Sequence, residues 1–103
     1  MQFAITAYDG KDEGALGRRM AVRPQHLENI ARVKETGSVV CAGGITNETG
    51  QLVGSVVVLD FDTKGQFDAY MESEPYIKAG VWQDITVNTV NVLIVNDEPY
   101  SQN

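Results

Sequence analysis

The sequence contains a single cysteine, a single histidine and three prolines among its 103 residues. One cysteine cannot form a disulfide within the chain, and one cysteine with one histidine cannot supply the ligands of a zinc site built from these residue types. The glycines at positions 10, 14 and 17 lack the spacing of a dinucleotide-binding or phosphate-binding loop. We therefore expect no metal ion and no cofactor.

Long apolar runs and positive charge are also scarce. The longest strictly aliphatic run, residues 56–59, is far shorter than the roughly 20 residues of a membrane span. Residues 1–9 do not have the pattern of a secretion signal, so we expect a cytoplasmic protein. The net charge of −6 repels phosphate backbones and anionic lipids. Neither nucleic acid nor a membrane is an expected partner.

The composition that remains is that of an ordinary globular protein, with 43% apolar and 21% charged residues. A chain of this length allows one domain, which we assign to residues 1–96, followed by a polar tail over residues 97–103. So short a chain buries only about 60–68% of its unfolded surface, and pairing with a second copy would enlarge its core.

Hydrophobic patterns indicate the first elements. Residues 2–8 alternate between apolar and polar side chains, which is typical of a half-buried strand. Residues 9–17, with three glycines and four charged residues, are predicted to form a mobile loop. A helix is predicted over residues 23–36, with Pro24 in its first turn and Gly37 as its stop.

The second half of the chain begins with a predicted hairpin. Two runs rich in β-branched residues flank a polar connection that ends in glycine, and a helical pattern then precedes Pro75. In order, the predicted elements are strands at 38–46 and 51–61, a helix at 64–73, a turn at 75–80 and a strand at 85–95.

The resulting order, β-α-β-β-α-β, predicts an α+β fold of the ferredoxin-like type: a four-stranded antiparallel sheet with two helices on one face. In a sheet with water on its other face, apolar and polar residues should alternate along each strand. In the last two predicted strands, however, the residues that point to either face are apolar. We expect Val56, Val58, Val90, Val92 and Ile94 on that second face, covered by a second copy. Two copies would form a dimeric α+β barrel with small-molecule clefts at the sheet edges.

His26 lies at the flank of the apolar stripe of the predicted helix, in line with Ile30 and Val33. An imidazole has an ordinary pKa of about 6.5, which suits a general acid or base at neutral pH. Simple packing at the helix flank is the alternative. Glu74 can orient or titrate with His26 if the two helices end side by side, or can merely begin the following turn.

Arg18, Arg19 and Arg23 cluster near the start of this helix in an otherwise acidic chain. Guanidinium groups bind carboxylate or enolate oxygens in a bidentate manner, so the cluster indicates a small anionic substrate. Surface pairing with the acidic residues of the preceding loop is the alternative.

Small residues interrupt two of the apolar strands. Ser55 and the pair Gly43 and Gly44 permit a ligand or a partner backbone to approach closely, although Gly54 equally indicates a bulge. Cys41 is predicted to be a buried, inert thiol with no role.

The segment RMAVRPQHL at residues 19–27 resembles the R-P-x-H-L element of YciI-like proteins. Asp9, the Ala42-Gly43 pair, the Gly54-Ser55 pair, the Glu74-Pro75-Tyr76 run and residues 79–81 stand in the order of matching elements in that family. The resemblance covers nearly the whole chain. It implies a ferredoxin-like fold, a homodimer, and a cleft centred on a histidine and an acidic residue.

The resemblance also implies roles for individual residues. Its catalytic candidates are His26 and Glu74, and its substrate-binding candidates are Arg19, Arg23, Ser55, Tyr76, Asp9 and Gly43. One position departs from the pattern, because the family usually has D-P-Y where this chain has Glu74-Pro75-Tyr76. The longer side chain displaces the carboxylate, which puts a tight pair with His26 in question.

By analogy with isomerases and lyases of this barrel architecture, we predict a cofactor-free enzyme that acts on a small anionic or hydroxylated ring-derived compound. Elimination of HCl from a chlorinated hydroxyquinol suits the predicted groups, since it needs a base, an acid and no redox partner. His26 would move the proton, and Arg19 or Arg23 would hold developing negative charge. The alternative is a non-catalytic protein that binds or senses a small metabolite in the same cleft.

Overall fold

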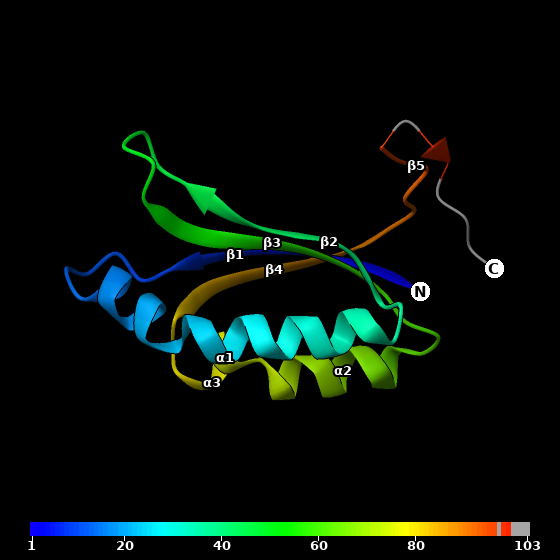
Figure 1. Ribbon diagram of the computed structural model, residues 1–103, viewed down its shortest axis with the longest axis horizontal. Helices are drawn as coiled ribbons and strands as arrows, with labels where there is room; N and C mark the ends of the chain where they lie inside the picture. Colours follow the sequence, from blue (N-terminus) through cyan, green and yellow to red (C-terminus); the bar gives the residue numbers. More distant parts are fainter. Residues whose placement is uncertain (97, 100–103) are drawn as a thin grey trace.

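The computed structural model describes the chain over residues 1–96 and 98–99 (Figure 1). The elements are β1 Gln2–Asp9, α1 Ala15–Glu35, β2 Val39–Thr46, β3 Leu52–Asp60, α2 Lys64–Ser73, α3 Pro75–Lys78, β4 Trp82–Val90, β5 Ile94–Val95 and β6 Glu98–Pro99. No helix among these residues is both long and apolar enough to cross a bilayer.

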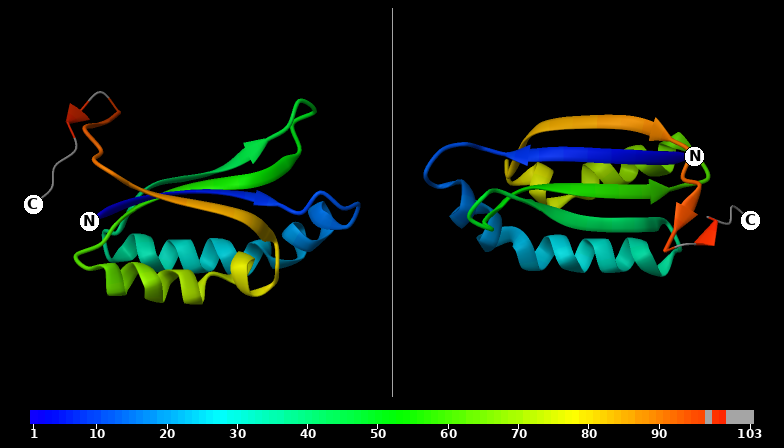
Figure 2. Two further views of the ribbon diagram at one scale, coloured as in Figure 1. Left: turned by 180° about the vertical axis from the view of Figure 1, so that it is seen from behind. Right: turned by 90° about the horizontal axis from the view of Figure 1, so that it is seen from above.

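The main sheet has the order β2-β3-β1-β4, and every neighbouring pair is antiparallel. Figure 2 shows this order from above, and Figure 1 shows that α1 and α2 lie on one face of the sheet. The arrangement confirms the predicted ferredoxin-like α+β fold. The small β5-β6 sheet stands apart from it and was not predicted.

The helix-covered face carries the core. On β1 and β3, Phe3 lies opposite Leu59 and Ile5 opposite Val57, and all four side chains are buried. Phe67 of α2 stacks on Phe3 with ring centroids 4.1 Å apart. Burial of each such side chain contributes about 1.5–3 kcal/mol, so these rows fix the register of the sheet against the helices.

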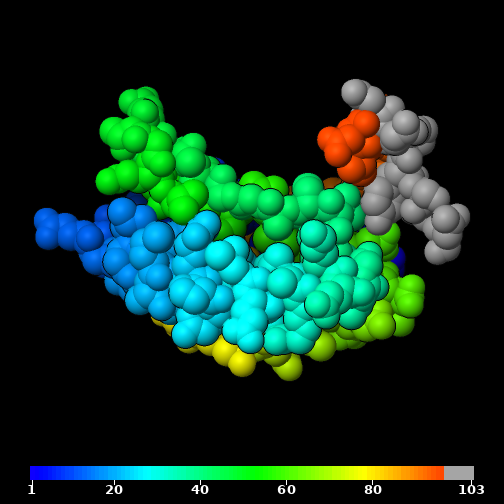
Figure 3. All heavy atoms as spheres, in the orientation of Figure 1, coloured from blue at the N-terminus to red at the C-terminus, as the bar shows by residue number. Residues whose placement is uncertain are grey.

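The opposite face is open in the single chain. Two neighbouring rows cross the whole sheet without a charged side chain: Gly43, Val56, Thr6 and Thr86 in one, and Cys41, Val58, Ala4 and Asn88 in the other. The hairpin between β2 and β3 and the β5 segment rise on either side of this face, and the surface between them is hollowed (Figures 1 and 3). Cys41 is exposed here, so the prediction of a buried thiol was wrong for the single chain.

Two predicted elements match the structure closely. Helix α2 spans Lys64–Ser73 as predicted, and a capping box between Thr63 and Gln66 begins it. The hairpin turn also lies where it was predicted, and Gly50 takes a φ of 84° that favours glycine. Gly54 tolerates no side chain, because a Cβ there would collide with the Ala7 carbonyl oxygen.

Helix α1 begins eight residues earlier than predicted, at Ala15 rather than residue 23. The Ala, Leu, Arg and Met residues of this extra stretch favour helix, and Pro24 is accommodated inside the helix instead of starting it. Gly37, with a φ of 79°, lies just past the end of the helix as predicted. The predicted mobile loop is therefore shortened to residues 10–14.

The last strand was predicted too late in the chain. β4 ends at Val90 because that residue pairs with Gln2, the first residue of β1, and no partner strand continues beyond it. Val92 and Ile94 consequently lie outside the main sheet, which corrects their predicted place on its second face. The turn predicted at 75–80 contains the short helix α3. Of the predicted tail, residues 98–99 form β6, and the remainder lies outside the described residues.

Candidate functional site

A buried histidine–glutamate pair lies where α1 passes the junction of α2 and α3. The His26 Nδ1 atom is 2.5 Å from Glu74 Oε1, and their side chains are 10% and 0% exposed. With the glutamate ionised, Nδ1–H donates to the carboxylate and Nε2 remains as the second ring nitrogen for proton transfer. The longer side chain at position 74 has therefore not prevented a tight pair.

Three donors converge on the Glu74 carboxylate. The Tyr70 hydroxyl donates to Oε2 at 2.7 Å, and the backbone N–H of Tyr76 donates to Oε1 at 3.1 Å beside the contact from His26. Burial alone would raise the pKa of Glu74, but the hydrogen bond and charge of His26, with the bonds from Tyr70 and Tyr76, bring it below its ordinary value. The carboxylate is thus held in its ionised form.

Aromatic rings enclose the imidazole. The His26 ring stacks on Tyr76 with centroids 4.0 Å apart, and Trp82 meets it edge-on at 6.0 Å. Tyr76 is completely buried, and its hydroxyl has no hydrogen-bond partner in the described part of the chain. Burial raises the pKa of this hydroxyl, so it keeps its proton at neutral pH and is a hydrogen-bond donor.

A second polar cluster adjoins the first through these rings. The Arg19 Nη1 atom lies 3.0 and 3.1 Å from the two carboxylate oxygens of Asp9, and Nη2 donates to Ser55 Oγ at 2.9 Å. The Trp82 indole N–H donates to the same Ser55 oxygen at 3.1 Å. The Arg19 guanidinium also lies 4.8 Å from the centre of the Tyr76 ring. The two clusters therefore form one continuous buried site.

This site contains more hydrogen-bond donors than acceptors. Ser55 Oγ already accepts twice, so its own O–H is left to donate, and none of the described residues accepts it. Arg19 Nε and the Tyr76 hydroxyl are also buried without a partner among them. Buried donors without acceptors cost free energy, and oxygen atoms of a bound molecule would satisfy them. The site is suited to a ligand rich in acceptor oxygens.

The buried Arg19–Asp9 pair should also matter for stability. An Asp9→Asn variant should lose about 3 kcal/mol, because the Arg19 charge would stay buried without a counter-charge. Asp12→Asn is the matched control, since Asp12 pairs with Arg18 on the surface and its loss should leave stability nearly unchanged. Urea denaturation of both variants measures the difference, and equal stabilities would contradict this assignment.

Most of the sequence-predicted site residues meet here. The structure brings together His26, Glu74, Arg19, Ser55, Tyr76 and Asp9. Arg23 lies at the margin, half-buried and without a hydrogen bond or ion pair to the rest of residues 1–96, and its charge acts on the pKa of Tyr76. Gly43 is not part of this cluster, because it faces the open side of the sheet opposite Val56.

Two further residues belong to the site geometry. They are Tyr70 of α2, which bonds to Glu74, and Trp82 of β4, which bonds to Ser55. The spacing of four residues between Tyr70 and Glu74 was the available signal, since such pairs meet on a helix. Trp82 gave no comparable signal, because its bond to Ser55 joins residues 27 positions apart.

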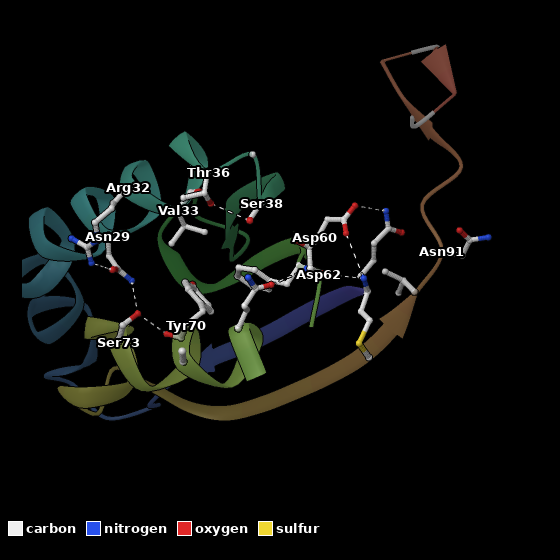
Figure 4. A pocket seen from close by; sticks show the side chains of 17 residues that line it. Asn29, Arg32, Val33, Thr36, Ser38, Asp60, Asp62, Tyr70, Ser73 and Asn91 are labelled. Atoms are coloured by element: carbon white, nitrogen blue, oxygen red, sulfur yellow. Dashed lines mark hydrogen bonds and ion pairs between the residues drawn. The ribbon is translucent and has the colours of Figure 1, made fainter. Parts of the chain in front are cut away.

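Two hollows lie near the site. A cavity of about 580 Å³ is lined by Asp9 of the buried pair, together with Tyr8, Leu16 and Leu52, and is of a size that suits a small molecule. A larger groove of about 1060 Å³ lies between α1, α2 and the sheet, and Tyr70 lines it beside Asn29 and Ser73 (Figure 4). Within the described residues, no three His, Cys, Asp or Glu side chains are grouped to hold a metal ion.

Known proteins share this fold. A 5-chloro-2-hydroxyhydroquinone dehydrochlorinase from Burkholderia phenoliruptrix, solved with 2,5-dihydroxybenzoquinone, has a TM-score of 0.75 at 20% identity, over 88% of this chain and 94% of that one. A dimeric ferredoxin-like protein from Jannaschia sp. has a TM-score of 0.53 at 18% identity, over 88% and 98% of the two chains. At these identities the likeness concerns the fold.

Sequence comparison is more specific. Protein YciI of Escherichia coli is 30% identical over 93 residues, which cover 84% of this chain and 93% of that protein. A family model of the YCII-related domain matches residues 1–91. The match includes every residue of the buried site, from Asp9 to Trp82. The chain therefore belongs to the YCII-related domain family.

Proposed function

We propose that this protein is a cofactor-free lyase or isomerase in which His26 transfers a proton on a small, hydroxylated or anionic ring-derived compound. The observation that carries the proposal is the buried His26–Glu74 pair, with Nδ1 and Oε1 2.5 Å apart. A carboxylate that fixes one ring nitrogen makes the other a directed base and, once protonated, a directed acid.

The surrounding groups suit an oxygen-rich substrate. The Tyr76 hydroxyl, the Ser55 hydroxyl and Arg19 Nε offer donors in a water-poor site, where they would stabilise an oxyanion as charge develops on it. The charge of Arg19 is already balanced by Asp9, so this residue supplies donors more than net charge. Arg23 is the better candidate to attract an anionic substrate.

Elimination of HCl from a chlorinated hydroxyquinol is the specific reaction that we propose. A proton first moves from a ring hydroxyl to the carbon that bears chlorine, which gives the keto tautomer. A second hydroxyl then loses its proton, its electron pair re-forms the ring double bond, and chloride leaves with the electrons of the C–Cl bond. The products are a hydroxyquinone and HCl, no external oxidant is needed, and His26 can carry the protons. The dehydrochlorinase with the same fold supports this choice by analogy, as does its bound dihydroxybenzoquinone.

A substrate panel tests the proposal. The protein is incubated with 5-chloro-2-hydroxyhydroquinone, its unchlorinated parent and a ring-cleavage lactone, while chloride release and product spectra are followed. We expect turnover of the chlorinated compound or isomerisation of the lactone. The absence of turnover for every member of the panel would contradict the enzymatic proposal.

Ligand binding without catalysis is the second candidate, favoured by the excess of buried donors around Ser55 and Tyr76. A binding protein needs these donors and aromatic walls but no titrating pair. It would show saturable affinity for the panel compounds and no product. An enzyme would instead show a rate with a pH inflection that disappears when His26 is replaced.

We also propose that the protein acts as a homodimer whose two open sheet faces pack together. The uncharged rows across that face support this assembly, and the Jannaschia protein of similar fold is dimeric. We further propose that residues 1–96 act as one domain and that the protein works in the cytoplasm.

A further inference from the structure

We propose that Tyr70 is a positioning residue, matched to the glutamate at position 74, that holds the Glu74 carboxylate in place for His26. The inference rests on the proposed function for the role of His26. Its geometric basis is the bond of 2.7 Å from the Tyr70 hydroxyl to Glu74 Oε2. Tyr70 forms no hydrogen bond or ring contact with His26, so it would act through the glutamate.

The two carboxylate oxygens have separate partners. Oε1 accepts bonds from the His26 ring and the backbone N–H of Tyr76, and among the described residues Oε2 accepts a bond from Tyr70 alone. Without Tyr70, one oxygen of a fully buried carboxylate would lose its one partner in that part of the chain. Such a loss is costly for a charged group and would leave the carboxylate free to rotate.

Tyr70 itself is firmly held. It is buried on α2, where its ring packs 6.4 Å from that of Phe61, and Glu74 follows one helical turn later as the helix ends. Burial and the charge of Glu74 both raise the pKa of the Tyr70 hydroxyl, so it keeps its proton and donates throughout the neutral range. The donor is therefore fixed in both position and protonation.

The length of the Glu74 side chain explains why its carboxylate needs the bond from Tyr70. A glutamate has one more rotatable bond than an aspartate, so more freedom must be removed to aim its carboxylate. The bond to Tyr70 restrains the oxygen that faces away from His26. We expect an aspartate at position 74, which is one methylene shorter, to lose the contact with Tyr70 when it keeps the contact with His26.

Electrostatics predicts how the pair responds when this bond is lost. The hydroxyl stabilises the carboxylate most when His26 is neutral, because the imidazolium otherwise compensates the charge. Removing it should therefore favour the protonated imidazole and move its titration to higher pH. The other ionisable groups around the pair are Arg19 and Arg23 on α1, Asp9 on β1 and Tyr76 on α3, and they are unchanged in the experiment.

A Tyr70→Phe variant tests the inference without any substrate. His26 is the only histidine, so a single imidazole NMR signal reports its titration. We expect the midpoint to move to higher pH in Tyr70→Phe and to stay in place in Tyr8→Phe, an exposed tyrosine on β1. If the folded variant titrates like the wild type, Tyr70 does not position the pair.

The match to glutamate is tested in a second background. In the Glu74→Asp variant, adding Tyr70→Phe should cause no further shift of the His26 titration midpoint, because the shorter side chain no longer accepts a hydrogen bond from Tyr70. A further shift of the same size as in the wild type would overturn the match. In the wild type, the Tyr70 hydroxyl proton signal should also move as His26 titrates; an unmoved signal overturns the coupling even if the variant does not fold.

Activity supplies a separate readout. Once a substrate is known, Tyr70→Phe should lower kcat about 10-fold with KM little changed. The variant alters the orientation and proton affinity of His26 but leaves the substrate contacts in place. If no substrate is ever turned over, the proposed function fails while the NMR result still decides the role of Tyr70. The two failures are therefore distinguishable.

Discussion

A His26→Gln variant should release chloride about 10²- to 10⁴-fold more slowly than the wild type, because general acid–base catalysis contributes rates of this size. Glutamine is the informative replacement. Its amide can still donate to the Glu74 carboxylate, which would otherwise stay buried and unpaired. The protein should therefore remain folded and bind substrate with nearly unchanged affinity, so that the loss falls on kcat.

The control is Glu28→Gln, which removes a charge from the exposed side of the same helix, two residues from His26. It should retain full activity. Chloride release and substrate binding are measured for both variants, together with thermal melting. Equal turnover by His26→Gln and the wild type would remove His26 from the mechanism and leave the ligand-binding alternative.

The sequence predicted those elements whose signals are local. Helix α2 was correct at both ends because Thr63 caps its start and Pro75 disfavours helix at Glu74. Helix α1 was predicted too short because Pro24 was taken as a first-turn residue and the glycines before it as a loop. The longer helix places Arg19 against Asp9, and this ion pair stabilises its first turns. Local sequence patterns do not report such a tertiary contact.

The site residues also divide into those with a local sequence signal and those that depend on tertiary packing. His26 and Glu74 were found because a lone histidine and a distinctive Glu-Pro-Tyr run stand out in the sequence. The pairing of Ser55 with both Arg19 and Trp82 depends on how three distant elements pack, so no spacing rule predicts it. Gly43 was assigned to the site because the Gly43-Gly44 pair permits close approach and the Ala42-Gly43 pair resembles a family element. Its register opposite Val56 places it on the other face of the sheet.

A Val56→Asp variant should convert the protein from a dimer to a folded monomer. Val56 is 38% exposed on the open face of the single chain and lies in a row that carries no charge. In the proposed dimer this row is covered, and an aspartate there would be buried without a partner. We expect the dissociation constant to rise by at least about 10²-fold, since an unpaired buried charge costs several kcal/mol.

The neighbouring residue provides a matched control for this assembly. Val57 is 1% exposed and points into the helix-covered core, so Val57→Asp should unfold the chain at any concentration instead of dissociating it. Sedimentation across the micromolar range, with circular dichroism at each concentration, separates the two outcomes. For the wild type the melting temperature should also rise with concentration, as expected when folding is linked to association. If the wild type sediments as a folded monomer throughout this range, the open face is not a dimer interface, and its uncharged rows need another occupant.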